Sequence, residues 1–364
     1  MTRLGVVLAL LYLFLVGVGL LGDGIGALGE DLQQQLFASV DNPMAGLMVG
    51  LLATVLAQSS SVTTSTIVGL VGTGLLSVEA AVPMVMGANI GTTVTNTLAS
   101  LGHVRRPSEF RPAFAAATVH DIFNVLAVAV LLPLELLTGL LSSMAEALTS
   151  LLVGTGGVEY DSPIKEAVDY PVDLVVDALT AVGLQGNALG LTMAAAGLAA
   201  IFVALASITS NMRVLIASRV EASLNAMLGR GGGAPAILLG IVITVAVQSS
   251  SITTSILIPL AAAGVVTLRN IYPVTLGANV GTTISALLAS LATARPEALT
   301  VALVHTIFNV LGILLFYPVP GLRDVPVRLA ERLADVATQR RSAVIGYVLA
   351  LFVLTPALGV LILR

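Results

Sequence analysis

Three sequence blocks occur twice in this chain, in the same order, and this duplication constrains the fold more than any other feature. Residues 57–65 (AQSSSVTTS) match residues 247–255 (VQSSSITTS) at seven of nine positions. Residues 87–95 (GANIGTTVT) match 277–285 (GANVGTTIS) at six of nine, and 119–126 (VHDIFNVL) match 304–311 (VHTIFNVL) at seven of eight. The separations are 190, 190 and 185 residues. The chain therefore consists of two related halves.

The composition predicts that lipid is the solvent for both halves. Of the 364 residues, 57% are hydrophobic and 10% are charged, whereas a soluble domain carries about 25% charged residues. The mean hydropathy is +1.02, which is too high for a surface in water. The absence of cysteine excludes disulfides and thiolate metal sites, and three histidines argue against a transition-metal centre.

Seven stretches reach the length of about 20 apolar residues that a membrane-spanning helix needs: 4–22, 79–101, 111–132, 188–208, 270–292, 298–317 and 344–363. The first could instead be a cleaved signal peptide, but the apolar region of a signal peptide is usually shorter, about 7–15 residues. We therefore expect seven full spans.

Two further apolar stretches, 43–76 and 233–265, are interrupted by the polar tracts 58–65 and 248–255. The leg before each tract has about 15 residues, roughly 22 Å of helix, which is too short for a hydrocarbon core of about 30 Å. These stretches are predicted to be re-entrant hairpins, which are tolerated where protein or a watery cavity surrounds them.

Four amphipathic stretches, 28–40, 134–153, 213–229 and 321–341, are expected to lie along the membrane surface, although 134–153 could instead cross. Each half then has three crossings, and this odd number inverts the second half. The predicted class is an all-α polytopic membrane protein with two inverted-topology repeats. Repeat 1 is 1–153, an extracellular acidic loop is 154–187, repeat 2 is 188–341, and 342–364 is an additional C-terminal span.

The basic residues test this topology. On the predicted path, thirteen of the sixteen Lys and Arg residues lie on the side of the N-terminus. The positive-inside rule then places the N-terminus in the cytoplasm and the C-terminus outside the cell. The hairpin 43–76 enters from outside and 233–265 enters from the cytoplasm, so their tips meet near the midplane, as in inverted-repeat transporters.

The hairpin tips have the chemistry of an anion site. Each tip restarts a helix after a run of serines, and a helix N-terminus has free N–H groups and positive dipole character. The alternative is that these hydroxyls only pack membrane helices together. The candidate anion ligands are Ser59, Ser60, Ser61, Thr64, Ser249, Ser250, Ser251 and Thr254.

Sodium is the expected companion of the anion. No Lys or Arg lies in either tip, so an anion there needs cations that arrive with it. The glycines beside Asn89 and Asn279 permit local unwinding, and freed carbonyl, amide and hydroxyl oxygens suit Na⁺. The alternative is close helix packing at those glycines.

Asp121 is an acid deep inside a predicted span and is a functional candidate by default. Its alternative is a protonated structural acid, or one paired with His120. For His120 and its repeat counterpart His305 we expect hydrogen bonding between helices.

At these residues the chain resembles the type II sodium–phosphate cotransporter family. The resemblance covers both QSSS tips, both GANxGTT blocks, and the stretch from 108–114 (SEFRPAF) to 119–124 (VHDIFN). It implies sodium-driven uptake of hydrogen phosphate through the cell membrane, by alternating access around a midplane site between the tips. It implies no enzymatic activity, no cofactor beyond the coupling Na⁺, and, by analogy, a homodimer; nothing suggests nucleic acid as a partner.

The resemblance also implies residue roles. It places phosphate and sodium at the tips, with one sodium site formed by Gln248, Ser249, Ser250, Thr282 and Ser285. Asp121 stands where electrogenic members keep an aspartate, after Ala115 and Ala117. The predicted sodium-binding set is Gln58, Asn89, Thr92, Asp121, Asn124, Gln248, Ser249, Ser250, Asn279, Thr282 and Ser285.

The chain departs from the family pattern in two places. Arg106 and Pro107 stand where animal members have an acidic residue, and the extracellular loop is short and lacks cysteine. Three other functions compete. A sodium-coupled dicarboxylate or sulfate carrier shares the two-hairpin plan, and a passive anion channel would lack sodium dependence. A membrane enzyme with a serine nucleophile would need a general base near the serines.

Overall fold

The structure is a computed structural model that describes residues 3–29, 32, 42–153, 163–228 and 233–363. Within these residues helix is the only regular secondary structure, which confirms the predicted all-α class. The helices are α1 (Arg3–Gly26), α3 (Pro43–Ala57), α4 (Ser60–Gly72), α5 (Val78–Gly91), α6 (Val94–Ser100), α7 (Pro107–Thr138), α8 (Leu140–Val153), α9 (Pro163–Ala181), α10 (Gly186–Leu228), α11 (Ala234–Val247), α12 (Ser250–Ala262), α13 (Leu268–Ser290), α14 (Pro296–Phe316), α15 (Pro320–Gln339), α16 (Arg341–Leu349) and α17 (Thr355–Leu363).

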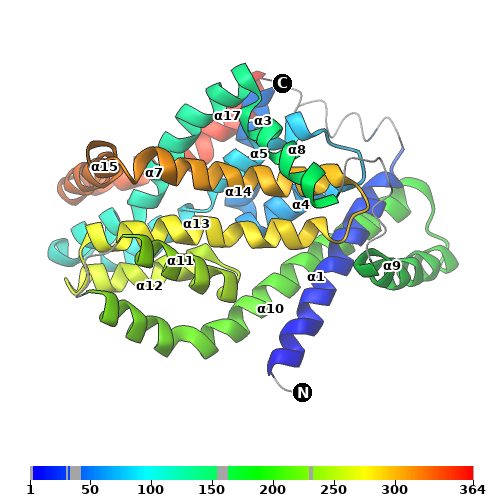
Figure 1. The fold of residues 1–364 in the computed structure, drawn as a ribbon, viewed down its shortest axis with the longest axis horizontal. Coiled ribbons are helices and arrows are strands. Elements are labelled where there is room, and N and C mark those ends of the chain that lie inside the picture. Colours follow the sequence, from blue (N-terminus) through cyan, green and yellow to red (C-terminus); the bar gives the residue numbers. More distant parts are fainter. Residues whose placement is uncertain (1–2, 30–31, 33–41, 154–162, 229–232, 364) are drawn as a thin grey trace.

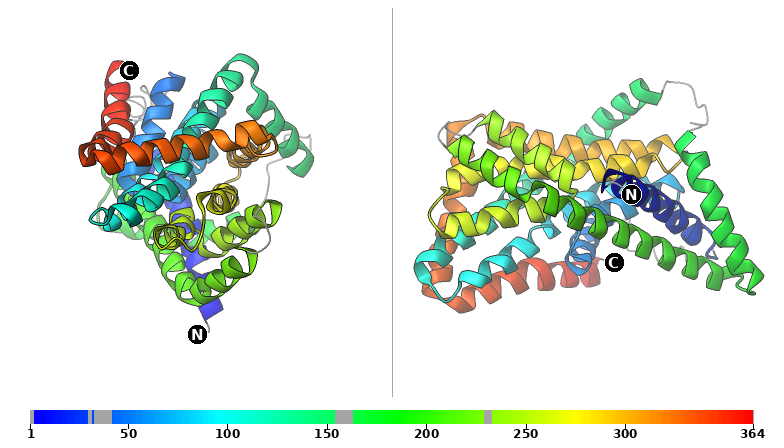
Figure 2. Two further views of the ribbon diagram at one scale, coloured as in Figure 1. Left: turned by 90° about the vertical axis from the view of Figure 1, so that its left-hand side faces the viewer. Right: turned by 90° about the horizontal axis from the view of Figure 1, so that it is seen from below.

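The helices form one bundle around α13 and α14, which lie side by side through its middle (Figure 1). The long helices α1 and α10 pack against each other along one side, and α9 flanks them. The helices α15 to α17 cover the other side, and the left view of Figure 2 shows the N-terminus and the C-terminus at opposite ends of the bundle.

Six helical stretches within the described residues are long and apolar enough to cross a membrane: Gly5–Gly26, Pro107–Thr138, Gly186–Met212, Leu268–Ser290, Pro296–Phe316 and Arg341–Leu363. The seventh predicted span, 79–101, is not a continuous helix. It is divided into α5 and α6 at Thr92 and Thr93, whose hydroxyls donate to the carbonyls of Ala88 and Ile90. Such bonds from threonine to the preceding turn compete with the helix ladder.

The two interrupted apolar stretches are helix pairs. Helices α3 and α4 have 15 and 13 residues, and α11 and α12 have 14 and 13. Each pair is broken at the glutamine and first serine of the repeated tip. None of the four reaches the length of about 20 residues that spans a bilayer.

Glycines pack the first helix of each pair directly on a neighbouring helix. A Cβ at Gly50 would lie 1.9 Å from the Met84 carbonyl oxygen, and one at Gly240 would lie 2.0 Å from that of Val274. Gly50 and Gly240 are 190 residues apart, and so are Met84 and Val274. The packing of α3 on α5 therefore uses the same contact as the packing of α11 on α13.

The unwinding that the flanking glycines would permit is absent from the second block, and in the first block it follows Asn89 only after Gly91, at Thr92 and Thr93. Helix α5 continues through Asn89 and α13 continues through Asn279. A Cβ at Gly87 or Gly277, two residues before these asparagines, would lie 1.9 Å from a carbonyl oxygen of the neighbouring helix. These glycines therefore serve close helix packing, which was the alternative interpretation.

Several segments outside the core differ from expectation. The predicted span 188–208 and surface helix 213–229 form one helix, α10, as far as Leu228, and residue 229 lies outside the described residues. The stretch 134–153 is divided by Gly139, at φ 62°, between α7 and α8. The predicted loop 154–187 contains helix α9, while its first nine residues and most of 28–40 lie outside the described residues.

Candidate functional site

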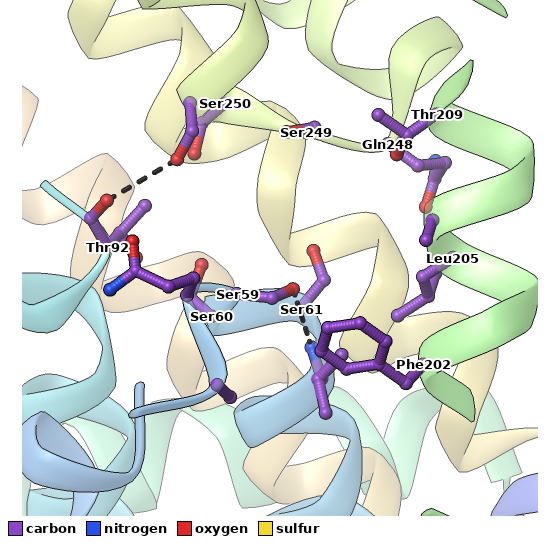
Figure 3. A pocket seen from close by; sticks show the side chains of 15 residues that line it. Ser59, Ser60, Ser61, Thr92, Phe202, Leu205, Thr209, Gln248, Ser249 and Ser250 are labelled. Carbon is purple, nitrogen blue, oxygen red and sulfur yellow. Dashed lines mark hydrogen bonds between the residues drawn. The ribbon is translucent and has the colours of Figure 1, made fainter. Parts of the chain in front are cut away.

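Both repeated tips line one cavity of about 180 Å³. All six tip serines, both glutamines and Thr92 contribute to its lining, and Phe202, Leu205 and Thr209 of α10 form one wall (Figure 3). The structure thus brings together residues that are 190 positions apart in the sequence. Thr64 and Thr254, the other two candidate anion ligands, do not line the cavity, and their hydroxyls donate to the carbonyls of Ser60 and Ser250 one turn earlier.

The backbone at each tip has an unusual conformation. Gln58 and Gln248 have φ angles of 53° and 57°, and they are the only non-glycine residues with positive φ in the described part of the chain. A side chain in this left-handed region costs about 1–2 kcal/mol, and such strain is retained mostly at functional sites. This left-handed conformation reverses the direction of the chain within two residues.

The residue after each glutamine caps the next helix. Ser59 Oγ accepts from the Val62 N–H at 3.3 Å, and Ser249 Oγ accepts from the Ile252 N–H at 3.4 Å. Helices α4 and α12 therefore start at the cavity, where the first N–H groups of a helix have no partner within it. Two helix N-termini at one cavity favour an anion.

The two glutamine side chains make equivalent bonds. Each Nε2 donates at 2.6 Å to the carbonyl three residues earlier, Val55 or Val245. Gln58 Oε1 accepts from Thr95 Oγ1 at 3.0 Å, and Gln248 Oε1 accepts from Ser285 Oγ at 2.9 Å. Thr95 was not predicted as a site residue, although its offset of 190 from Ser285 was a signal that could have found it.

Three of the five residues that the resemblance implies for one sodium site, Gln248, Thr282 and Ser285, lie close together. Besides its contact with Gln248, Ser285 Oγ lies 3.1 Å from Ser61 Oγ of the other tip. Thr282 lies one turn earlier on α13, and its hydroxyl donates to the Ala278 carbonyl, which leaves its oxygen able to accept or coordinate. These amide and hydroxyl oxygens are ligands that suit a hard cation.

The second tip also contacts the break between α5 and α6. Ser251 Oγ donates to the Thr92 carbonyl at 3.4 Å, and Ser255 Oγ donates to Asn96 Oδ1 at 3.1 Å. The end of α5 leaves this carbonyl without a helical partner, so the break turns it toward the tip. Asn96 was not predicted as a site residue, because the sequence analysis treated 79–101 as one continuous span.

Asp121 is fully buried and lies outside the cavity lining. Its Oδ2 accepts from Thr97 Oγ1 at 3.0 Å and from the Tyr347 hydroxyl at 2.8 Å. Its Oδ1 has no partner among the described residues. The alternative of a pair with His120 is wrong, because that histidine is bonded to Asn279. Helix α6 thus connects Asp121, through Thr97, to the tip contacts of Asn96.

The asparagines of the repeated blocks form a buried network between the halves. The bonded groups run in the order His120, Asn279, Asn124, Asn89, Asn309 and His305. The Asn279 amide donates to Asn124 Oδ1 at 2.6 Å, and the Asn89 amide donates to Asn309 Oδ1 at 2.9 Å. His305 Nε2 lies 3.4 Å from Asn89 Oδ1. The expected helix–helix hydrogen bonding by His120 and His305 is confirmed.

This network changes the interpretation of three predicted sodium ligands. The side-chain oxygens of Asn89, Asn124 and Asn279 each accept a hydrogen bond within it, and none of the three residues lines the cavity. Their geometry is that of a structural network that holds the two halves together.

Replacing Asn124 by alanine is expected to lower the free energy of unfolding by about 1–3 kcal/mol, because it removes partners of two buried groups. The melting temperature should fall equally with and without sodium, and Asn211→Ala, which loses only a bond to the Ser207 carbonyl of its own helix, should have little effect. A fall confined to sodium-containing buffer would instead identify Asn124 as a sodium ligand.

The chain is similar to known sodium-dependent phosphate transport proteins. The family profile that matches the chain is described as Na⁺/Pi-cotransporter and covers residues 13–157 and 200–319. The chain is 34% identical to the sodium-dependent phosphate transport protein 2A of Mus musculus, over 98% of this chain and 67% of the mouse protein. It is 33% identical to the sodium-dependent phosphate transport protein 2B of Homo sapiens, over 97% of this chain and 64% of the human protein. No solved structure matches the chain.

Proposed function

The chain belongs to the Na⁺/Pi-cotransporter family, and we propose on that basis that its two QSSS tips bind inorganic phosphate together with Na⁺ in the cavity between them. The protein is a multi-pass membrane transporter that couples phosphate uptake to sodium, and it is not an enzyme. The observation that carries the site assignment is the meeting of all six tip serines at one cavity.

Charge balance explains why sodium is needed. None of the described residues that line the cavity is Lys or Arg. The starts of α4 and α12 supply about half a positive charge each, whereas phosphate near neutral pH carries about 1.5 to 2 negative charges. A deficit of about 0.5 to 1 positive charge remains, and leaving it in a low-dielectric site is unfavourable. Sodium at Gln248 and Ser285 offsets it.

The proposed architecture is an inverted repeat with alternating access. Repeat 1 (1–153) and repeat 2 (188–341) are joined by 154–187 and followed by the C-terminal span 342–364. Helices α3 and α4 enter as a hairpin from outside, α11 and α12 enter from the cytoplasm, and α5 with α6 completes the crossing expected at 79–101. The repeated glycine contacts and glutamine bonds support this symmetry.

The orientation and assembly are part of the proposal. The positive-inside rule supports a cytoplasmic N-terminus and an extracellular C-terminus, in the cell membrane. The exposed apolar side chains of α16 and α17, which include Ile345, Leu361 and Ile362, support contact with lipid. A homodimer remains an inference by analogy with the family.

The transport proposal is tested by uptake of radiolabelled phosphate into proteoliposomes that contain the purified protein. An inward sodium gradient should drive accumulation, and an equal potassium gradient should not. Excess unlabelled sulfate or dicarboxylate should leave the uptake unchanged. Competition by either would identify the alternative sodium-coupled carrier, and uptake without sodium dependence would contradict the charge argument.

Asp121 is proposed to make transport electrogenic. In its ionised form the Asp121 carboxylate adds a negative charge inside the membrane, which favours one more Na⁺ per cycle. Asp121→Asn keeps the shape and removes this charge, so the phosphate-induced current should be lost while electroneutral uptake persists. Tyr347→Phe, which removes one donor and keeps the charge, should retain the current. An undiminished current in Asp121→Asn would contradict the role.

A further inference from the structure

A second cavity, of about 250 Å³, lies at the other end of α13 from the tips. It is formed where α11, α13 and α15 begin and α14 ends, and its polar lining is Arg269, Asn270, Tyr272, Tyr317, Arg323 and Asp324. Arg269 precedes Ser285 by 16 residues on the same helix, which is about 24 Å of axial distance. The cavity is therefore separate from the one between the tips.

The fixed charges of this cavity are mostly positive. Asp324 is the one carboxylate among its described lining residues. Its Oδ1 pairs with Arg269 at 2.9 Å, and its Oδ2 pairs with Arg328 at 3.4 Å. The Arg323 guanidinium lies 5.6 Å above the ring of Tyr317 and has no carboxylate partner among the described side chains. The lining thus holds two guanidinium groups and one carboxylate, and Arg328 outside the lining shares that carboxylate, so an anion would restore the balance.

Tyr272 provides a second and independent sign of a missing ligand. Its side chain is 1% exposed, and its ring packs against Phe123 and Tyr317. Its hydroxyl has no hydrogen-bond partner among the described residues. The nearby guanidinium groups can only donate, so they cannot accept the hydroxyl proton. The acceptor that this buried donor lacks must come from whatever fills the cavity.

We propose that this cavity binds a phosphoryl group, as an anion site distinct from the transport cavity. Two arginine side chains supply charge and forked donors, and the Tyr272 hydroxyl supplies a further donor. In the proposed topology α15 lies on the cytoplasmic membrane surface, where basic pockets between helices bind anionic headgroups. The phosphoryl group then comes from a lipid headgroup or from free inorganic phosphate.

The chain contains no tryptophan, so Tyr317→Trp creates a single fluorescent reporter inside the cavity and keeps an aromatic face beneath Arg323. The full-length protein is placed in phosphatidylcholine nanodiscs in sodium-free buffer. One arm titrates inorganic phosphate, and the other varies the content of phosphatidylinositol 4-phosphate. We expect a saturable shift of the emission with one of the two probes, which identifies the source.

Removing the donors should weaken this response. In the reporter background, Tyr272→Phe and Arg323→Gln should each raise the half-saturating probe concentration about tenfold, because each removes a hydrogen bond to a charged group. The matched control is Arg332→Gln, also on α15 but outside the cavity lining, and it should titrate like the reporter alone. The unmodified protein should also gain thermal stability from the effective probe, and Tyr272→Phe should gain less.

The proposal is overturned if neither probe changes the emission or the melting temperature, or if Tyr272→Phe and Arg323→Gln respond like the control. The result of this binding test does not depend on whether the transport cavity binds phosphate. Gln248→Gly, which alters the tip, should lose sodium-driven uptake but retain the reporter response. Loss of both in that variant would indicate that the probe acts at the tips instead.

Discussion

Gln248→Gly is expected to lower sodium-driven phosphate uptake at least about tenfold while the protein stays folded. Glycine adopts φ 57° without the penalty that a side chain has there, so the chain reversal is preserved or stabilised. What is lost is the amide whose Oε1 accepts from Ser285 beside Ser61. A lost interaction with a charged ligand costs about 1.5–3 kcal/mol, which is about a tenfold to hundredfold loss of affinity.

The measurement is radiolabelled uptake in proteoliposomes, with the melting temperature recorded for the same preparation. Gln58→Gly should behave in the same way, because Gln58 makes the equivalent bonds to Val55 and Thr95. The exposed Gln185 offers a control outside the helices, and Gln185→Gly should keep full uptake. Full uptake by Gln248→Gly would mean that the tips need only the left-handed backbone, and that the glutamine amide binds no ligand.

Gly50→Ala and Gly240→Ala are each expected to destabilise the protein by about 3 kcal/mol, at the upper end of the range for overpacked cores. The added Cβ would lie 1.9 Å from the Met84 carbonyl oxygen or 2.0 Å from that of Val274. The obstructing atom is backbone in both cases, so a side-chain rotation cannot relieve the overlap. The melting temperature should fall by roughly 5–10 °C, or the protein should fail to purify as a single species.

Gly346→Ala is the matched control, because a Cβ there would meet no atom within 4 Å. Its melting temperature should be unchanged or slightly higher, since alanine favours the helix. If Gly50→Ala and Gly240→Ala were as stable as this control, the close contact of α3 with α5 and of α11 with α13 would be incorrect.

The site was predictable from sequence to the extent that it depends on local chemistry. The glutamines, the tip serines and Ser285 were identified from repeated motifs and from a family resemblance, and they meet at or beside one cavity. Thr95 was not predicted as a site residue, although it lies 190 positions before Ser285 and so occupies the equivalent position in the first repeat. The wall residues of α10, such as Phe202 and Thr209, could not be found, because no motif marks the helix that happens to cover a cavity.

The asparagines show what the sequence leaves undecided. Asn89, Asn124 and Asn279 have the oxygen chemistry of sodium ligands, and in the structure each of their oxygens accepts a hydrogen bond from a residue more than 100 positions away. An amide side chain serves equally well as a ligand or as a network partner. Whether such an amide binds an ion or joins a hydrogen-bond network depends on which residues of the neighbouring helix lie opposite it.

The sequence by itself determined the helical class, the membrane environment, the duplication and the breaks at Gln58 and Gln248, because hydropathy, repeat spacing and capping residues act locally along the chain. The tertiary structure decided the division of α5 from α6, the use of Gly87 and Gly277 for packing, and the separation of polar residues into a cavity and a buried network. These outcomes depend on which surfaces meet across the bundle. A contact between residues 190 positions apart is set by helix packing, which local patterns do not encode.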